Sequence, residues 1–217
     1  MTIDAARPAD QDAFLSLVGL ATPGTPVPES ITGAIHLPLC PPLTHGTALA
    51  LVARTPHSPH PVGALIGGIP QWVFAHPLCV ERKVLPKLLS SLVFTISAVA
   101  VTPGARGQGI GRKLIRSAER RAREANFALV TLEHEPVLGD FYTRLGYHTG
   151  DRQLVIALTS CDLLGQEFDG LHTAYKGLTP NIRVVEVPGA PARIVSGMLP
   201  GSTLPASARL DGRRVVT

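Results

Sequence analysis

The chain has 217 residues, enough for one well-buried domain with an appendage, and its formal net charge of +4 is modest evidence for an anionic ligand. An aromatic content of 5%, with no interleaving of basic and aromatic residues, argues against nucleic acid as a partner. The three cysteines, Cys40, Cys79 and Cys161, are odd in number and widely spaced, which argues against a disulfide framework or a zinc cluster. We therefore predict a cytoplasmic protein without a metal site.

No stretch of the sequence predicts a membrane segment. The longest candidate, residues 88–101, is interrupted by serine and threonine and is shorter than the roughly 20 apolar residues that a spanning helix needs. We interpret it as a buried strand. The N-terminus has no basic stretch followed by an apolar one, so we expect no signal peptide and no membrane partner.

The first 70 residues predict a strand, a helix and a hairpin. A short strand near Ile3 precedes a helix capped by Asp10, with apolar residues at helical spacing from Ala13 to Val18. The proline-rich stretch Ala21–Leu43 permits only a brief helix around residues 30–35. The β-like runs 47–54 and 62–69 are separated by a proline-containing turn and predict an antiparallel hairpin.

Between Val99 and Leu114 the pattern changes from a β-branched apolar run to glycines and then to an amphipathic helix, so we predict a strand, a loop and a helix ending near Asn126. Amides at the start of a helix lack partners inside it and are partly positive, and glycines let an anion approach them. The loop is not a P-loop, because Gly111 is followed by Arg112 rather than by Lys-Ser/Thr. A dinucleotide-binding fingerprint fits no better, because its acidic residue is missing.

Arg106, Gly109 and Gly111 match the pattern Arg/Gln-x-x-Gly-x-Gly/Ala, and this stretch resembles the acyl-CoA signature of the GNAT superfamily of N-acyltransferases. A second stretch, Phe141–Tyr147, resembles the family's downstream motif and follows at the usual distance. The resemblance covers about residues 3–158. The alternative interpretation is a glycine-rich turn before an ordinary core helix.

The resemblance implies an α/β (α+β) fold with a mixed, twisted central sheet and helices on both faces. On this basis we expect residues 1–160 to form the acetyltransferase domain. Residues 161–217 would be a C-terminal extension acting as a lid, a dimer arm or a partly disordered tail. A homodimer is one possible assembly of the chain. Local patterns predict strands at 128–133, 153–158 and 182–187 and helices at 138–145 and 163–175.

The resemblance also implies acetyl-CoA as the cofactor. Its pantetheine arm would run along the main chain of Val99 and Val101, and its pyrophosphate would lie on the loop amides. The loop and first-turn residues assigned to this site are Arg106, Gly107, Gln108, Gly109, Ile110, Gly111, Arg112 and Lys113.

Tyr142 takes the position from which many relatives protonate the leaving thiolate, and the alternative is a core tyrosine packed with Phe141. The fourth strand lacks the glutamate that serves as base in many relatives. The next candidates for the base are Glu133, His134 and Glu135 at the end of the fifth strand, and we choose Glu133. Glu133, Glu135 and the insertion residue Trp72 are our candidates for binding the acceptor. The two glutamates could equally form a solvated strand end, and the insertion, Gln71–Lys87, could instead cover a sheet edge or make a dimer contact.

The sequence therefore predicts an N-acetyltransferase that moves an acetyl group from acetyl-CoA to a primary amine of a small molecule by direct attack. Two alternatives stay open at this point. One is acetylation of protein or aminoacyl-tRNA amines, and the other is a non-catalytic acyl-CoA-binding module.

Overall fold

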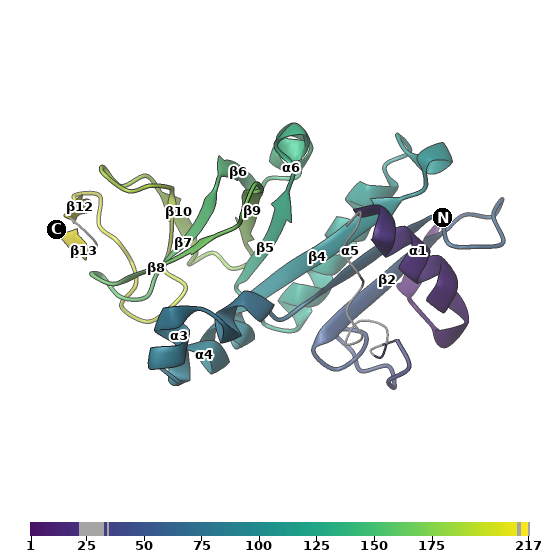
Figure 1. The fold of residues 1–217 in the computed structure, drawn as a ribbon, viewed down its shortest axis with the longest axis horizontal. Coiled ribbons are helices and arrows are strands. Elements are labelled where there is room, and N and C mark those ends of the chain that lie inside the picture. Colours follow the sequence, from purple (N-terminus) through teal and green to yellow (C-terminus); the bar gives the residue numbers. More distant parts are fainter. Residues whose placement is uncertain (22–32, 34, 212–213, 217) are drawn as a thin grey trace. The chain divides into compact units, whose positions relative to one another are not determined.

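A computed structural model describes residues 1–21, 33, 35–211 and 214–216 (Figure 1). Two compact units make up the chain, and each contains two separate segments of the sequence. The first unit comprises Met1–Ile69 and Thr95–Asn126, and the second comprises Pro70–Phe94 and Phe127–Thr217. Most of the brief helix expected around residues 30–35 lies outside the described residues.

The first unit contains an antiparallel sheet in the strand order β1-β2-β3-β4. These strands are β1 (Thr2–Ala5), β2 (Ala48–Arg54), β3 (Gly63–Gly68) and β4 (Val93–Val101). The predicted hairpin is confirmed, because β2 and β3 pair over their whole length. Asp10 takes part in the helix start as the last residue of a 3-10 turn (Pro8–Asp10) that leads into the first helix, where its Oδ2 accepts a hydrogen bond from the Arg7 amide at 2.9 Å. It binds Arg54 in an ion pair of 2.6 Å, which ties the first helix to the end of β2.

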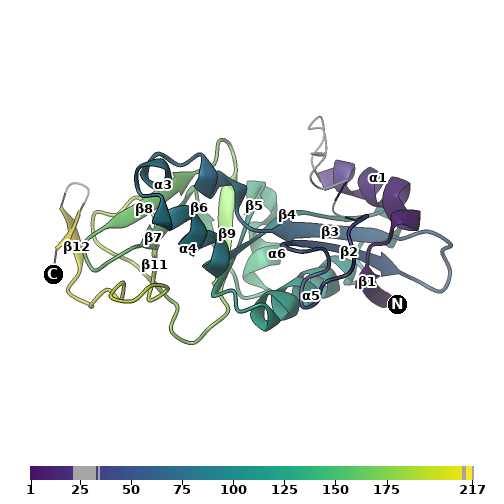
Figure 2. The same ribbon diagram turned by 90° about the horizontal axis from the view of Figure 1, so that it is seen from below.

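Helices cover both faces of this sheet, as the expected fold requires. Helix α1 (Gln11–Ala21) packs its buried residues, such as Phe14, on the face that includes Val52 and Ala64. Gly63 precedes Ala64 and faces the opposite side, where it lies under helix α5 (Ile110–Glu124). A Cβ atom added at Gly63 would lie 3.1 Å from Ile110, so this glycine lets α5 pack closely. Figure 2 shows α1 and α5 on opposite sides of the strands.

The second unit begins with helices in the segment that we identified as an insertion. A 3-10 turn (Gln71–Phe74) is followed by α3 (Pro77–Glu81) and α4 (Val84–Leu92). The prediction of a strand over residues 88–101 was therefore wrong for 88–92. Leu85 and Leu89 are buried and one helical turn apart, and the regular β-like run begins only at Val93.

The second unit contains three antiparallel strands that are neighbours in the order β5-β9-β6. They are β5 (Leu129–His134), β6 (His148–Asp151) and β9 (His172–Gly177). Between β5 and β6 the chain forms the short helix α6 (Gly139–Thr143), and Gly146 follows it with φ of +84°. The predicted strand at 128–133 is confirmed, and the predicted helix at 138–145 is confirmed in position.

A second sheet follows the order β10-β11-β7-β8, and its β11 and β7 are parallel. Its strands are β7 (Gln153–Ala157), β8 (Leu163–Glu167), β10 (Arg183–Val185) and β11 (Ile194–Ser196), and a separate pair joins β12 (Arg209–Asp211) to β13 (Arg214–Val216). The predicted strands at 153–158 and 182–187 are confirmed in position.

The predicted helix at 163–175 was wrong, because this stretch contains β8 and most of β9. A turn at Gly170, with φ of +72°, separates the two strands. All six residues of β9 pair with β5, so a distant partner strand overrides the local pattern. The expected boundary at residue 160 falls between β7 and β8, and these two strands pair with one another.

Candidate active site

The predicted cofactor loop lies within the first unit, between β4 and α5. Gly107 and Gly109 have φ angles of +78° and +75°, values that L side chains rarely adopt. A Cβ atom added at either position would have no neighbour within 4 Å, so the loop backbone is open to an approaching group. The amide of Lys113 donates to the Gly109 carbonyl, 3.1 Å away, and this bond starts the helix. The amides of residues 110–112 come before that of Lys113 and have no hydrogen-bond acceptor inside α5.

Charged side chains flank these amides. Arg112 and Lys113 are exposed in the first turn of α5. The Nε of Arg106 donates to the Val101 carbonyl at 3.2 Å, which fixes this side chain at the end of β4. Later in the helix, Arg120 and Arg123 form pairs with glutamates four residues away, each at 3.8 Å. The basic side chains nearest the loop are thus those best placed for an anion, and the loop fits the phosphates of a bound acyl-CoA.

Strand β4 presents the other predicted cofactor residues. Val99 and Val101 are half-buried and pair with Leu65 and Gly63 of β3. Further back, the register shifts so that Ile96 and Ala98 oppose consecutive residues of β3, which leaves Ser97 as an exposed bulge residue. The strand carries no carboxylate, so a base must come from another element.

Tyr142 lies in an aromatic cluster of the second unit. Its ring centroid is 5.0 Å from that of Phe141, 5.1 Å from His134 and 5.9 Å from Tyr147. The residue is only 4% exposed, and burial raises its pKa to about 12. The phenol is therefore protonated at neutral pH, as a proton donor must be, and both the catalytic and the packing interpretations of Tyr142 fit this environment.

His134, which we considered with Glu133 and Glu135 as a candidate base, is a buried polar residue. Its Nδ1 lies 2.7 Å from the Glu135 carbonyl, which fixes the hydrogen on Nδ1. Its Nε2 is buried without a hydrogen-bond partner among the described residues. The sequence showed that polar residues gather at the end of the predicted strand 128–133. The contact with Tyr142 was not, because it depends on how α6 folds back over β5.

Glu133 and His134 face opposite sides of β5, because side chains alternate along a strand. Glu133 is exposed, although the surrounding protein still raises the pKa of its carboxyl group. Glu135 is also exposed and lies just beyond the strand, before a 3-10 turn (Pro136–Leu138). The two glutamates thus lie at one end of β5, beside the residue that contacts Tyr142.

Trp72 occupies a different environment in the second unit. It packs on the apolar cluster that includes Leu85 and Leu89, and its ring makes an edge contact with His76 at 6.3 Å. These contacts show that Trp72 packs against the apolar core of the second unit. No contact joins Trp72 to Glu133 or Glu135 in the part of the chain that the structure describes.

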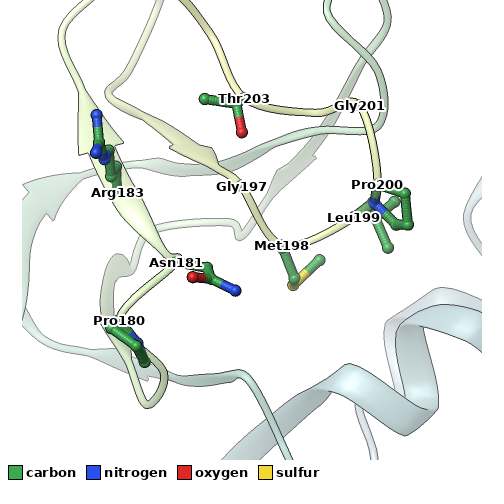
Figure 3. Close-up of a pocket in the computed structure, with 9 residues that line it drawn as sticks. All are labelled: Pro180, Asn181, Arg183, Gly197, Met198, Leu199, Pro200, Gly201 and Thr203. Atoms are coloured by element: carbon green, nitrogen blue, oxygen red, sulfur yellow. The ribbon is translucent and has the colours of Figure 1, made fainter.

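A pocket of about 480 Å³ opens in the second unit between β10 and the loop after β11 (Figure 3). None of the predicted site residues lines it. Its lining residues are Pro180, Asn181, Arg183, Gly197, Met198, Leu199, Pro200, Gly201 and Thr203. The predicted chemistry and this pocket therefore belong to different places in the fold.

Residues 66–149 match the family model of the acetyltransferase (GNAT) domain. Over this segment the chain is similar to the GNAT acetyltransferase domain. The matched segment runs from β3 to β6 and includes the glycine loop, Glu133 and Tyr142, so the resemblance found in the sequence is confirmed. The GNAT domain is that of an acetyltransferase, and acetyl-CoA is the cofactor of the family.

Solved structures support the same fold at low sequence identity. Ard1 from Thermoplasma volcanium has a TM-score of 0.52 and 16% identity, over 82% of this chain and 97% of its own. A GNAT family acetyltransferase from Elizabethkingia anophelis with acetyl-CoA bound has a TM-score of 0.51 and 13% identity, over 81% and 97%. The ribosomal-protein-S18-alanine N-acetyltransferase from Escherichia coli has a TM-score of 0.51 and 14% identity, over 82% and 94%. These likenesses confirm the predicted fold class.

No curated protein matches the sequence of this chain. Within the described residues, no helix is both long and apolar enough to cross a membrane. The same part of the chain holds no group of three or more His, Cys, Asp or Glu side chains that could bind a metal ion.

Proposed function

We propose that the chain transfers the acetyl group of acetyl-CoA to the primary amine of a small molecule by direct attack of the amine. The observation that carries this proposal is the environment of Tyr142, whose buried and protonated phenol packs against the end of β5. The same strand end carries two glutamates that could hold an ammonium group. A proton donor and carboxylates are what this reaction requires of a protein.

The loop of the first unit binds and orients the cofactor. Acetyl-CoA, when bound, supplies the thioester from which the acetyl group is transferred. The amides of residues 110–112 and the cations of Arg112 and Lys113 offer positive charge to phosphates. The backbone of Val99 and Val101 provides hydrogen-bonding groups along the end of β4, in the manner of strand addition.

Tyr142 acts as the general acid in this proposal. As the amine nitrogen forms its bond to the acetyl carbon, the carbon–sulfur bond breaks, and the phenol gives its proton to the departing sulfur. A phenol with a pKa near 12 is a weak acid, but it stays fully protonated, and its buried position keeps competing water away.

Glu133 acts as the acceptor anchor and as the base. An amine is mostly protonated at neutral pH and must lose a proton before it can attack. A carboxylate attracts the ammonium group, and its raised pKa makes it a better acceptor of the proton than an ordinary glutamate. Glu135 adds negative charge nearby, and Trp72 stays a proposed acceptor contact.

The proposal is tested by measuring thiol release from acetyl-CoA over a panel of amines. The panel contains an amino acid, an amino sugar, an aminoglycoside, a peptide with a free N-terminus and an aminoacyl-tRNA. Turnover of one or more of the small amines, with much less for the peptide and the tRNA, is the expected result. Selective turnover of the peptide or the tRNA would assign the enzyme to the alternative substrate class. No turnover with any amine, together with tight binding of acetyl-CoA, would indicate a non-catalytic acyl-CoA-binding module.

A further inference from the structure

A row of three polar residues crosses the β5-β9-β6 sheet on the face that carries Glu133. Thr173 of β9 lies directly opposite Glu133 of β5, and Asp151 of β6 lies opposite Thr173. Residues that face each other across antiparallel strands have their side chains on the same side of the sheet, with Cβ atoms about 5 Å apart. The three side chains therefore share one face and one row, and Figure 1 shows the three strands side by side.

Thr173 is the unexplained member of this row. It is 1% exposed, and its Oγ1 is buried with no hydrogen-bond partner among the described residues. Leaving a buried hydroxyl group unpaired costs about 1–3 kcal/mol, so native proteins seldom tolerate one without a reason. An absent partner that binds during function is one such reason.

Asp151, at the far end of the row, is already neutralised. Its Oδ2 accepts a hydrogen bond from the Tyr175 hydroxyl at 2.6 Å and one from the Nε of Arg193 at 2.9 Å. Arg193 also donates to the carbonyl of Thr149. Since a carboxylate held by a guanidinium group attracts a further cation only weakly, Asp151 is not free to hold an ammonium group.

Glu133, at the near end, has no ion pair or hydrogen bond within the described part of the chain, and its charge is therefore available. The row thus places one free carboxylate beside one unpaired hydroxyl group. A primary ammonium group has three donors, and it can be held by a carboxylate and a hydroxyl oxygen at the same time.

We propose that Thr173 is a specificity-determining residue of the acceptor site, where its Oγ1 accepts a hydrogen bond from the ammonium group that Glu133 holds. This inference rests on the proposed function and adds the geometry by which a primary amine is recognised. Because Arg193 neutralises Asp151, the row carries a single free negative charge. The site therefore suits one ammonium group per acceptor rather than two.

The test uses the full-length protein and the amine that turns over fastest in the panel. In Thr173→Val the KM for that amine should rise about tenfold or more, the effect of losing one hydrogen bond to a charged group, while kcat and the KM for acetyl-CoA change little. Thr173→Ser keeps the hydroxyl group and should restore the KM to within about threefold of the parent. Glu133→Gln should also raise the KM, and the double variant should lose less than the product of the two single losses, because both residues bind the same group.

The melting temperature separates this role from a structural one. Valine has the shape of threonine and removes an unpaired buried hydroxyl group, so Thr173→Val should be as stable as the parent or more stable. A lower melting temperature would mean that the hydroxyl group has a structural partner, and an unchanged KM in an active Thr173→Val variant would show that it does not touch the amine. Either result overturns this inference but leaves the proposed function standing. Absence of turnover with every amine overturns the proposed function, and this inference with it.

Discussion

The glycine loop of the first unit and the β5–α6 region of the second unit solve different recognition problems in different ways. The loop presents backbone amides and open space, and its glycines matter for the side chains that they lack. The β5–α6 region and the neighbouring strand β9 present buried side chains, including Tyr142, His134 and Thr173, that come from separate elements. A constant group such as a phosphate can be bound by a local backbone motif, whereas an acceptor and its proton transfers need side chains assembled from distant parts of the chain.

The largest effect on ligand binding is expected when a side chain is added to the glycine loop. Gly109→Glu should weaken CoA binding more than about 100-fold, because it places a bulky, negative side chain where phosphate must approach the amides. Titration calorimetry with CoA measures this loss.

Gly46→Glu is the matched control for that variant. Gly46 also has a positive φ, of +62°, and open space around it, so both variants carry the same backbone strain and the same added charge. The control should bind CoA normally. If a folded Gly109→Glu protein binds CoA as the parent does, the cofactor site lies elsewhere.

Tyr142→Phe tests the proposed general acid in the β5–α6 region of the second unit. It keeps the ring in the aromatic cluster but removes the proton donor, so kcat should fall about 10- to 1000-fold while the KM for acetyl-CoA changes little. Tyr147→Phe removes a hydroxyl group from the same cluster and should keep most of the activity. Since the pKa of Tyr142 is about 12, its ionisation should cause no loss of parental activity below about pH 11. Full activity of Tyr142→Phe would make the residue a packing residue only.

The same contrast explains what could be predicted from the sequence. The glycine loop could be predicted because its motif consists of residues that are close together in the sequence, and its strand and helix followed the expected patterns. The role that we propose for Thr173 could not be predicted, because it depends on the pairing of β5 with β9, in which Glu133 and Thr173 are about 40 positions apart. The same pairing overturned the predicted helix at 163–175. Leu88–Leu92 were misassigned because a short apolar run fits a helix or a strand equally well.

Arg193→Met tests whether the second region depends on residues beyond position 160. The ion pair with Asp151 is largely shielded, with side-chain exposures of 27% for Arg193 and 14% for Asp151. Removing the guanidinium group leaves a poorly solvated carboxylate, so stability should fall by about 2 kcal/mol, and thermal unfolding should show a decrease of several degrees.

Arg82→Met is the matched control for this loss. Its pair with Asp162 is longer, at 3.4 Å, and more exposed, so the cost should be below about 1 kcal/mol. Equal losses in the two variants would mean that the Arg193 pair is no more important to the unit than an ordinary surface pair.

The smallest effect is expected from the charge of Glu133 on stability. The side chain is exposed, but the protein around it removes part of its hydration and disfavours the charged form, so the pKa of Glu133 in the folded protein lies above the value of 4.5 for an ordinary glutamate. The folded state therefore holds this proton more tightly than the unfolded chain does. The resulting stability is fully present below pH 4.5 and is lost as the pH rises through the folded pKa. Glu133→Gln has no charge to bury, so it should melt slightly above the parent at pH 7 and together with it at pH 3. A variant that melts below the parent at pH 7 would mean that a cation stabilises the carboxylate in the folded protein, and Glu133 would then not be free to bind the acceptor.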